Sequence, residues 1–315
     1  MGYEMLEEIV TELRSFKGLT RKSAIGELLT ILKNTAYDDA GLIEFEDFKV
    51  VVSTDGIVED LVRCNPWRAG FSSVIVNVND VVAKGANPIG YVCVISSSSS
   101  KVRRMIAKGI NYGLSKYQLK FLKGHTHPDT SFDAIDAAVV GIAKNFLSST
   151  AAKPGDQLIT ALDLKGRLTL RGWLRTFDSV SGKSIKELSR RLKAMIEIAD
   201  KNLAHAARDI SGPGIIGTLG MLCESSRVGA EVNIEAIPKP KTIKLRDWLI
   251  TYPAIGFIIS TDKAEECLNI LKNHDLVADI IGRVTESKVI YLVHKGQREI
   301  FMNLYQESIF GLKNC

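Results

Sequence analysis

Apolar residues recur at helical spacing near the start of the chain and at alternating spacing further along. Leu6, Ile9, Val10 and Leu13 lie at intervals of three and four residues, which predicts an amphipathic helix. A second helix is expected around residues 25–32. Further helices are predicted at 101–117 and 184–208, and strands at 49–54, 119–126, 134–144, 157–164, 230–237, 255–260 and 289–294. The pattern is that of a mixed α/β protein.

The segment VIVNVNDVVAKGANP, residues 74–88, does not fit either pattern cleanly. Its alternation is compatible with a strand and also with a buried helix. It carries Asn77, Asn79, Asp80 and Lys84 inside an apolar run, and buried polar groups are costly unless they have partners. We therefore expect the rest of the chain or a ligand to supply those partners. By contrast, the run SSSSS at 96–100 is expected to be an exposed, flexible loop.

With 315 residues and 45% hydrophobic composition, the chain is larger than one core usually supports, so two domains are expected. The connector SSTAAKPGDQ suggests a boundary near residue 150, which gives domains 1–150 and 151–315. The apolar runs are shorter than the roughly 20 residues that cross a bilayer, and the acidic N-terminus does not resemble a secretory signal. A cytoplasmic protein with no membrane partner is therefore predicted.

Charge and cysteine content further limit the kinds of ligand and structural site that the chain is expected to have. The net charge of +5 comes from 41 basic and 36 acidic residues spread along the chain, without the dense basic face typical of nucleic-acid binding. A small anionic ligand is the more natural partner. Five cysteines lie far apart with no Cys-x-x-Cys pair, so neither a disulfide framework nor a zinc knuckle is indicated.

Five short stretches each join an acidic or small polar residue to a turn. They are DDAG (38–41), STDG (53–56), NVNDVVAKGANP (77–88), KGHTHPDT (123–130) and DISGPG (209–214). Taken singly, an aspartate in a turn most often bonds only to its own backbone. The order and spacing of the five together are more specific.

In these stretches the chain resembles the aminoimidazole-ribonucleotide-synthetase-like superfamily, which includes thiamine-monophosphate kinase, selenophosphate synthetase and a hydrogenase-maturation dehydratase. AKPGDQL resembles the opening of the superfamily's second domain, and GLTRKSAIGELL and GHTHPDT resemble an archaeal synthase-related branch noticed in methanogens. The resemblance implies a two-domain α/β (α+β) fold. The sheet of its N-terminal domain would pair across a homodimer, and its C-terminal domain would be mixed α/β.

The resemblance also implies an ATP and Mg²⁺ site. Residues 77–88 would form a helix with Asn77, Asp80 and Lys84 on one face. The expected metal ligands are Asp38, Asp39, Asp80 and Asp209, and the expected nucleotide-binding residues are Lys22, Asp55, Asn77, Asp80, Gly124, His125 and Thr126. Two carboxylates about 4 Å apart repel by about 4 kcal/mol at an effective dielectric constant near 20, so such a cluster favours a cation. Magnesium suits a site of carboxylates and phosphate oxygens.

Some residues differ from the superfamily pattern, and others have a simpler explanation than ligand binding. Gly124-His125-Thr126 stands where several relatives have Gly-Asp-Thr or Gly-Glu-Thr, so one carboxylate is missing. His125 and His127 would share one side of a strand, which also suits a transition metal, although ligand hydrogen bonding is the preferred reading. Lys22 stands at the expected start of the second helix, where the simpler interpretation is a solvated residue and the alternative is a contact to phosphate. The terminal Cys315 is expected to be an incidental thiol.

Two functions follow from these observations. The leading hypothesis is an ATP-dependent, magnesium-requiring enzyme that phosphorylates a small-molecule acceptor, or activates it with phosphate, as a kinase or synthetase does. No single residue can be assigned as the catalytic base. The alternative is a nucleotide-binding accessory protein that acts with partner proteins in cofactor or metalloenzyme maturation and has little turnover of its own.

Overall fold

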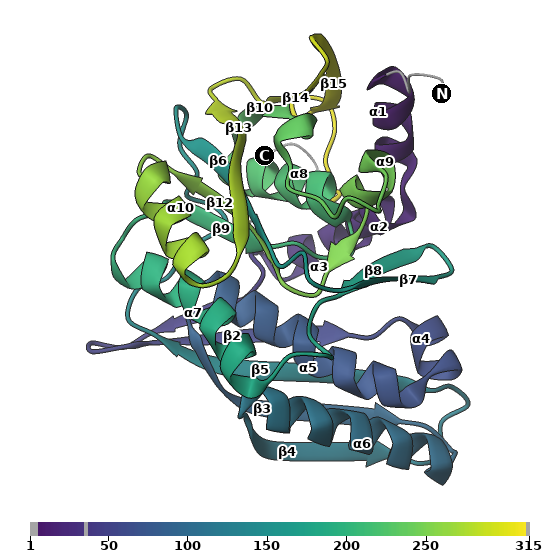
Figure 1. Cartoon of the computed structure of the whole chain (residues 1–315). Coiled ribbons are helices and arrows are strands. Elements are labelled where there is room, and N and C mark those ends of the chain that lie inside the picture. The colour runs from purple at the N-terminus through teal and green to yellow at the C-terminus, as the bar shows by residue number, and fades with distance from the viewer. Residues whose placement is uncertain (1–5, 35–36, 313–315) are drawn as a thin grey trace. The chain divides into compact units, whose positions relative to one another are not determined.

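The computed structural model describes residues 6–34 and 37–312, and these divide into two compact units (Figure 1). Asp39–Phe146 and Val180–Asp200 form the unit that we call the N-sheet unit. Met1–Asp38, Leu147–Ser179 and Lys201–Cys315 form the C-sheet unit. The sequence analysis used a single boundary near residue 150. In the structure, the first 38 residues belong with the second half of the chain, and residues 180–200 belong with the first half.

The N-sheet unit is a five-stranded sheet with strand order β1-β2-β5-β3-β4. Its strands are β1 (Gly41–Glu44), β2 (Lys49–Gly56), β3 (Asn87–Ser96), β4 (Lys120–His127) and β5 (Ala134–Ala143), and its helices are α4 (Glu59–Cys64), α5 (Pro66–Ala83), α6 (Ser100–Tyr117) and α7 (Ile185–Asp200). Because β5 is antiparallel to both β2 and β3, and β3 is parallel to β4, the C-terminal ends of β2, β3 and β4 meet at one edge of the sheet.

Helix α5 covers one face of this sheet and packs closely against α6 (Figure 1). It begins at Pro66, and the side chain of Asn65 caps it by accepting a hydrogen bond from the Arg68 amide at 2.9 Å. Glycines allow the close approach of α6: a Cβ on Gly70 would lie 2.1 Å from the carbonyl oxygen of Ile106. The helix expected at residues 77–88 is confirmed for residues 77–83, whereas Asn87 and Pro88 instead begin β3.

The C-sheet unit contains a seven-stranded sheet and a three-stranded sheet, with strand orders β15-β14-β10-β13-β6-β12-β9 and β11-β8-β7. Its strands are β6 (Gln157–Leu162), β7 (Arg167–Arg171), β8 (Leu174–Asp178), β9 (Ala206–Asp209), β10 (Gly229–Asn233), β11 (Tyr252–Pro253), β12 (Gly256–Thr261), β13 (Val277–Thr285), β14 (Val289–His294) and β15 (Gln297–Asn303). Its helices are α1 (Leu6–Ser15), α2 (Lys17–Thr20), η1 (Arg21–Ala24), α3 (Ile25–Ile31), α8 (Gly214–Ser226), η2 (Ile234–Ala236), α9 (Leu245–Leu249) and α10 (Ala264–Asn273).

Helix α8 lies at the centre of the C-sheet unit's core. Every residue from Gly214 to Cys223 is buried, as expected for a helix that is apolar on all sides. The end of the described chain packs against it: Glu224 accepts hydrogen bonds from the Ser308 hydroxyl at 2.5 Å and the Ile309 amide at 2.7 Å. Burial raises the pKa of Glu224. The predicted helix at residues 6–13 is confirmed as α1, whose buried residues are Leu6, Ile9, Val10 and Leu13.

Two predictions of local structure were wrong. The helix expected over 184–208 ends at Asp200, and residues 206–209 instead form β9, because its four buried residues pair with β12. The serine run is an exposed loop only at Ser98 and Ser99: Ser96 ends β3 and is buried, as is Ser97, while Ser100 begins α6. The Ser99 hydroxyl caps α6 by accepting a hydrogen bond from the Val102 amide at 3.3 Å. Small hydroxyl side chains suit both a crowded strand end and a helix cap.

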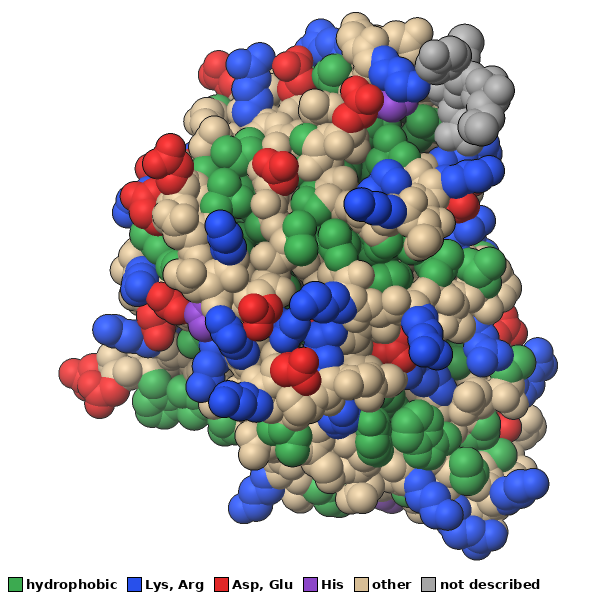
Figure 2. Space-filling view, viewed as in Figure 1, with side chains coloured by type: hydrophobic (Ala, Val, Ile, Leu, Met, Phe, Trp, Pro, Cys, Tyr) green, Lys and Arg blue, Asp and Glu red, His purple; other side chains and the backbone are tan. Residues whose placement is uncertain are grey.

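Among the described residues, no helix is long and apolar enough to cross a bilayer. On the face shown in Figure 2, basic and acidic side chains are intermixed, with apolar surface between them. This distribution agrees with the even spread of charge along the sequence.

We expect Gly70→Ala to destabilise the protein by roughly 2 kcal/mol, because the new methyl group would collide with the α6 backbone. Chemical denaturation followed by circular dichroism measures the change. Gly182→Ala is the matched control, since a Cβ there meets nothing within 4 Å. Equal free energies of unfolding for the two variants would show that the α5–α6 crossing accommodates the added methyl group.

Candidate functional site

The polar face of α5 is held from within the N-sheet unit. Ser53 on β2 donates its hydroxyl to Oδ2 of Asp80 at 2.5 Å and to Oδ1 of Asn77 at 3.3 Å. The Asn77 amide donates in turn to the carbonyl of Ser73 at 2.9 Å. Strand β2 and the preceding helical turn therefore supply partners for two of the polar groups in the segment 74–88.

A buried ion pair completes this helix-face cluster, which we define as Asp39, Ser53, Asn77, Asp80 and Lys84. The Lys84 ammonium lies 3.1 Å from Oδ2 of Asp39, and the two side chains are 0% and 7% exposed. A carboxylate oxygen of Asp39 also lies within 4.8 Å of one of Asp80. Two carboxylates this close repel, and the ammonium offsets part of that repulsion.

The donor atoms of the cluster fit a hard cation. Asp39 and Asp80 offer carboxylate oxygens, and Ser53 and Asn77 add a hydroxyl and an amide oxygen. Magnesium takes oxygen ligands of this kind and usually keeps positions for water or phosphate. Sequence reasoning placed Asn77, Asp80 and Lys84 on one face, as the structure does, but it did not select Ser53. Ser53 belongs to the stretch STDG, and the alternation of side chains along β2 could have indicated that it faces α5.

Asp55 and Gly124 occupy one row across the N-sheet. Asp55 is paired in register with Ala137, Ala137 with Cys93, and Cys93 with Gly124. Three strand spacings separate the ends of this row, or about 14 Å. Asp55 shares the side of β2 that carries Ser53, because side chains two residues apart on a strand point the same way.

An open-face pocket of about 350 Å³ lies on the N-sheet. It is lined by Thr54, Val92, Cys93, Val94, Lys123, Gly124, His125, Asp136, Ala137 and Ala138. Thr54 alternates with Ser53, so the pocket and the helix-face cluster lie on opposite faces of β2. Thr54, Lys123 and Asp136 were not selected from the sequence, and register across the strands is what brings them together.

Two histidines and a cysteine lie at or beside this pocket. His125 lines it, and the His125 and His127 rings are in edge contact with centroids 4.8 Å apart, so they share one side of β4 as predicted. Thr126 lies between them on the strand and does not line the pocket. Burial raises the pKa of the Cys93 thiol, which disfavours the reactive thiolate form.

The remaining predicted residues belong to the C-sheet unit. Asp209 is a buried residue at the end of β9, paired in register with Phe257. Asp38 accepts hydrogen bonds from the Ser149 amide at 2.7 Å and from the Ser148 and Ser149 hydroxyls, which gives it a role in anchoring the chain there. Lys22 lies in the short helix η1. Cys315 lies outside the described residues.

Comparison with known proteins identifies relatives along most of the chain. Residues 37–143 match the model of the AIR synthase related protein N-terminal domain, and residues 164–295 match that of its C-terminal domain. An uncharacterized protein of Methanocaldococcus jannaschii is 34% identical over 322 residues, which covers 97% of this chain and 99% of that protein.

Two further comparisons involve named proteins. The thiamine-monophosphate kinase of Pyrococcus abyssi is 30% identical over 291 residues, covering 85% of this chain and 90% of the kinase. The structure of T. maritima PurL complexed with ATP superposes with a TM-score of 0.73 at 18% identity. That match covers 87% of this chain but only 46% of the PurL chain, so at this identity it establishes a shared fold.

We expect Lys84→Met to lower the free energy of unfolding by about 3 kcal/mol, because Asp39 would keep its buried charge and lose the ammonium. The double variant Lys84→Met/Asp39→Asn should recover much of the loss. Thermal and chemical unfolding measure both, with the exposed Lys108→Met as the control. A double variant no more stable than Lys84→Met would contradict the assignment of the pair.

Proposed function

The chain belongs to the family of AIR synthase related proteins, and from that premise we propose that it is a magnesium- and ATP-dependent enzyme that phosphorylates a small molecule or activates it with phosphate. The family contains ATP-dependent enzymes, among them the thiamine-monophosphate kinase that resembles this chain over most of its length. The observation that carries the proposal is the helix-face cluster, where two carboxylates lie within 4.8 Å of each other on the N-sheet unit.

In this proposal Asp39 and Asp80 hold the magnesium, and the family resemblance adds Asp209 as a third ligand. Bound magnesium would neutralise charge on the phosphates, which is the main requirement of phosphoryl transfer. Ser53 fixes the Asp80 carboxylate through its hydrogen bond, and Lys84 holds Asp39 in place. Asp38 is left out of the proposed set because its carboxylate already accepts the hydrogen bonds from Ser148 and Ser149.

The nucleotide would extend from this cluster along the N-sheet. Asn77 and Asp55 are proposed to face its phosphates and sugar, while Gly124 and Thr126 bind its far part. His125 is left out of this set because it lines the open-face pocket, on the opposite face of the sheet. The row from Asp55 to Gly124 supports this arrangement, because its ends are too far apart to share one ion but suit two ends of an extended ligand. Lys22 is a further candidate for phosphate binding.

The first test concerns the metal dependence of nucleotide binding. ATP should bind only when magnesium is present, and Asp80→Asn should weaken this binding at least tenfold while leaving the fold intact, because an acidic cluster repels triphosphate until a metal bridges them. Isothermal titration calorimetry with and without a chelator measures it. Asp60→Asn, an exposed aspartate on α4, should bind ATP as the wild type does. Equal ATP affinity with and without magnesium would refute the proposed site.

Release of ADP from ATP, screened with candidate small-molecule acceptors, distinguishes the enzyme from the accessory protein. Acceptor-dependent ADP release by the purified protein is expected for a kinase or synthetase. Tight ATP binding without ADP release, whichever acceptor is added, would instead favour the accessory protein that acts in cofactor or metalloenzyme maturation.

We also propose a homodimer that pairs the N-sheet of two chains. Strand β4 is an edge strand that is exposed along its full length, and it carries Phe121 and Leu122 at 51% and 50% exposure. Exposed apolar edge strands usually need cover, and a second copy of the sheet supplies it.

Light scattering at micromolar concentration should report about twice the chain mass of 34.6 kDa. Leu122→Lys should shift the protein toward the single-chain mass, because charges on an edge strand oppose pairing. Leu170→Lys, on an equally exposed apolar residue of β7, is the control. A wild-type protein with only the single-chain mass would exclude the dimer.

A further inference from the structure

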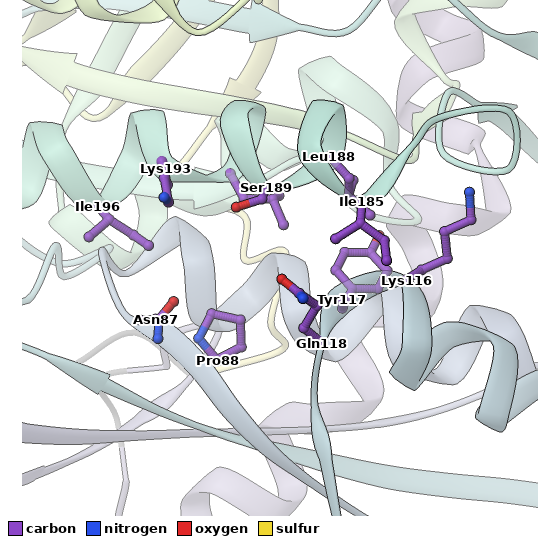
Figure 3. A pocket seen from close by; sticks show the side chains of 11 residues that line it. Asn87, Pro88, Lys116, Tyr117, Gln118, Ile185, Leu188, Ser189, Lys193 and Ile196 are labelled. Carbon is purple, nitrogen blue, oxygen red and sulfur yellow. The ribbon is translucent and has the colours of Figure 1, made fainter.

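A second cavity in the N-sheet unit is built by elements that the proposed nucleotide site does not use. It lies between the start of β3, the end of α6 and helix α7, and we call it the α6–α7 pocket (Figure 3). Its volume is about 260 Å³, and it shares no lining residue with the open-face pocket or the helix-face cluster. A ligand there would therefore not compete for the residues proposed to bind ATP.

The inner wall of the α6–α7 pocket is apolar. Leu188 and Leu192 of α7 are 1% and 6% exposed, and Pro88, Tyr117 and Ile196 complete this wall. A cavity of about 150 Å³ in a protein core is enough for benzene, so about 260 Å³ admits one aromatic ring with a short substituent. Tyr117 offers an aromatic ring against which a planar group can stack.

The polar groups of the pocket carry positive charge and hydrogen-bonding capacity but no carboxylate. Ser189 and Lys193 face Asn87 and Gln118 across it, and Lys116 lies at one end (Figure 3). Lysine is the only charged residue type in the lining, so an anionic group on the ligand is complementary and a cationic one is not.

The two lysines differ in what they already bind. The Lys116 ammonium donates to the carbonyl oxygens of Ser181 and Lys183, which ties the segment before α7 to α6. Tyr112 also donates to the Ser181 carbonyl at 3.3 Å, and Arg68 donates to the Ser181 hydroxyl at 2.8 Å. Lys116 thus fixes the pocket's geometry, while the exposed Lys193 is the cation available to a ligand.

From this arrangement we propose that the α6–α7 pocket binds a small monocyclic aromatic carboxylate. The ring lies against Pro88, Tyr117 and Leu188, and the carboxylate accepts hydrogen bonds from Lys193 and Ser189. Asn87 and Gln118 supply further amide donors at the rim. Because the walls are tied together before a ligand arrives, little ordering cost is added on binding.

Calorimetric titration of the full-length protein with 3-phenylpropanoate tests the proposal. Saturable binding is expected, with the neutral 3-phenylpropanol at least fivefold weaker. Lys193→Gln should weaken binding of 3-phenylpropanoate at least fivefold and leave binding of 3-phenylpropanol unchanged. Lys186 is an exposed lysine of the same helix that lies outside the pocket, so Lys186→Gln should leave binding of 3-phenylpropanoate unchanged.

A pocket-filling variant distinguishes this site from surface attraction. Ser189→Phe should abolish binding of both compounds, with its fold checked by circular dichroism and thermal unfolding. Asp80→Asn should bind the acid as the wild type does, which separates this site from the proposed ATP site. Failure of 3-phenylpropanoate to saturate at millimolar concentration, or equal weakening by Lys186→Gln and Lys193→Gln, would overturn the proposal.

Discussion

The buried ion pair between Lys84 and Asp39 is the constraint on which the arrangement of the N-sheet unit depends. A fully buried ammonium must keep a carboxylate beside it, because an unpaired charge costs several kcal/mol away from water. Lys84 follows the end of α5, and Asp39 is the residue at which the chain enters this unit. The pair therefore fixes the entering chain against the end of the helix, and the Ser53–Asp80 hydrogen bond fixes β2 against the same helix.

That alignment places different functional side chains on the two faces of β2. Ser53 and Asp55 fall on the side that meets α5, while Thr54 lies on the side of the open-face pocket. A shift of one residue in the pairing of β2 would exchange the two faces and leave Asp80 without its hydroxyl partner. The eight residue pairs between β2 and β5 hold the register, and the glycines at the α5–α6 crossing let the two helices approach each other closely.

The sequence predicted elements well where one periodicity dominates, as in α1, α6 and β5. It was ambiguous at α5, whose buried sides are both apolar, and the family resemblance rather than periodicity identified the helix. Helix α8 was not among the predicted elements, and its glycines lower the helix propensity of the segment. In the structure, Gly217 and Gly220 let Leu19 and Ile309 pack closely. At the site, the aspartates were visible as motifs, whereas Ser53 and Asp136 depend on cross-strand register that one sequence does not display.

Helix α7 belongs to the N-sheet unit although the strands β6 to β8 of the other unit precede it in the chain. Gly85 packs against Ala199, whose carbonyl accepts a hydrogen bond from the Asn145 amide. On the ribosome, the sheet is complete at Ala143, but its last helix emerges several seconds later at ordinary rates of synthesis. The N-sheet unit therefore lacks helix α7 while strands β6 to β8 of the other unit are being synthesised, so it can be completed only after part of the C-sheet unit has been made.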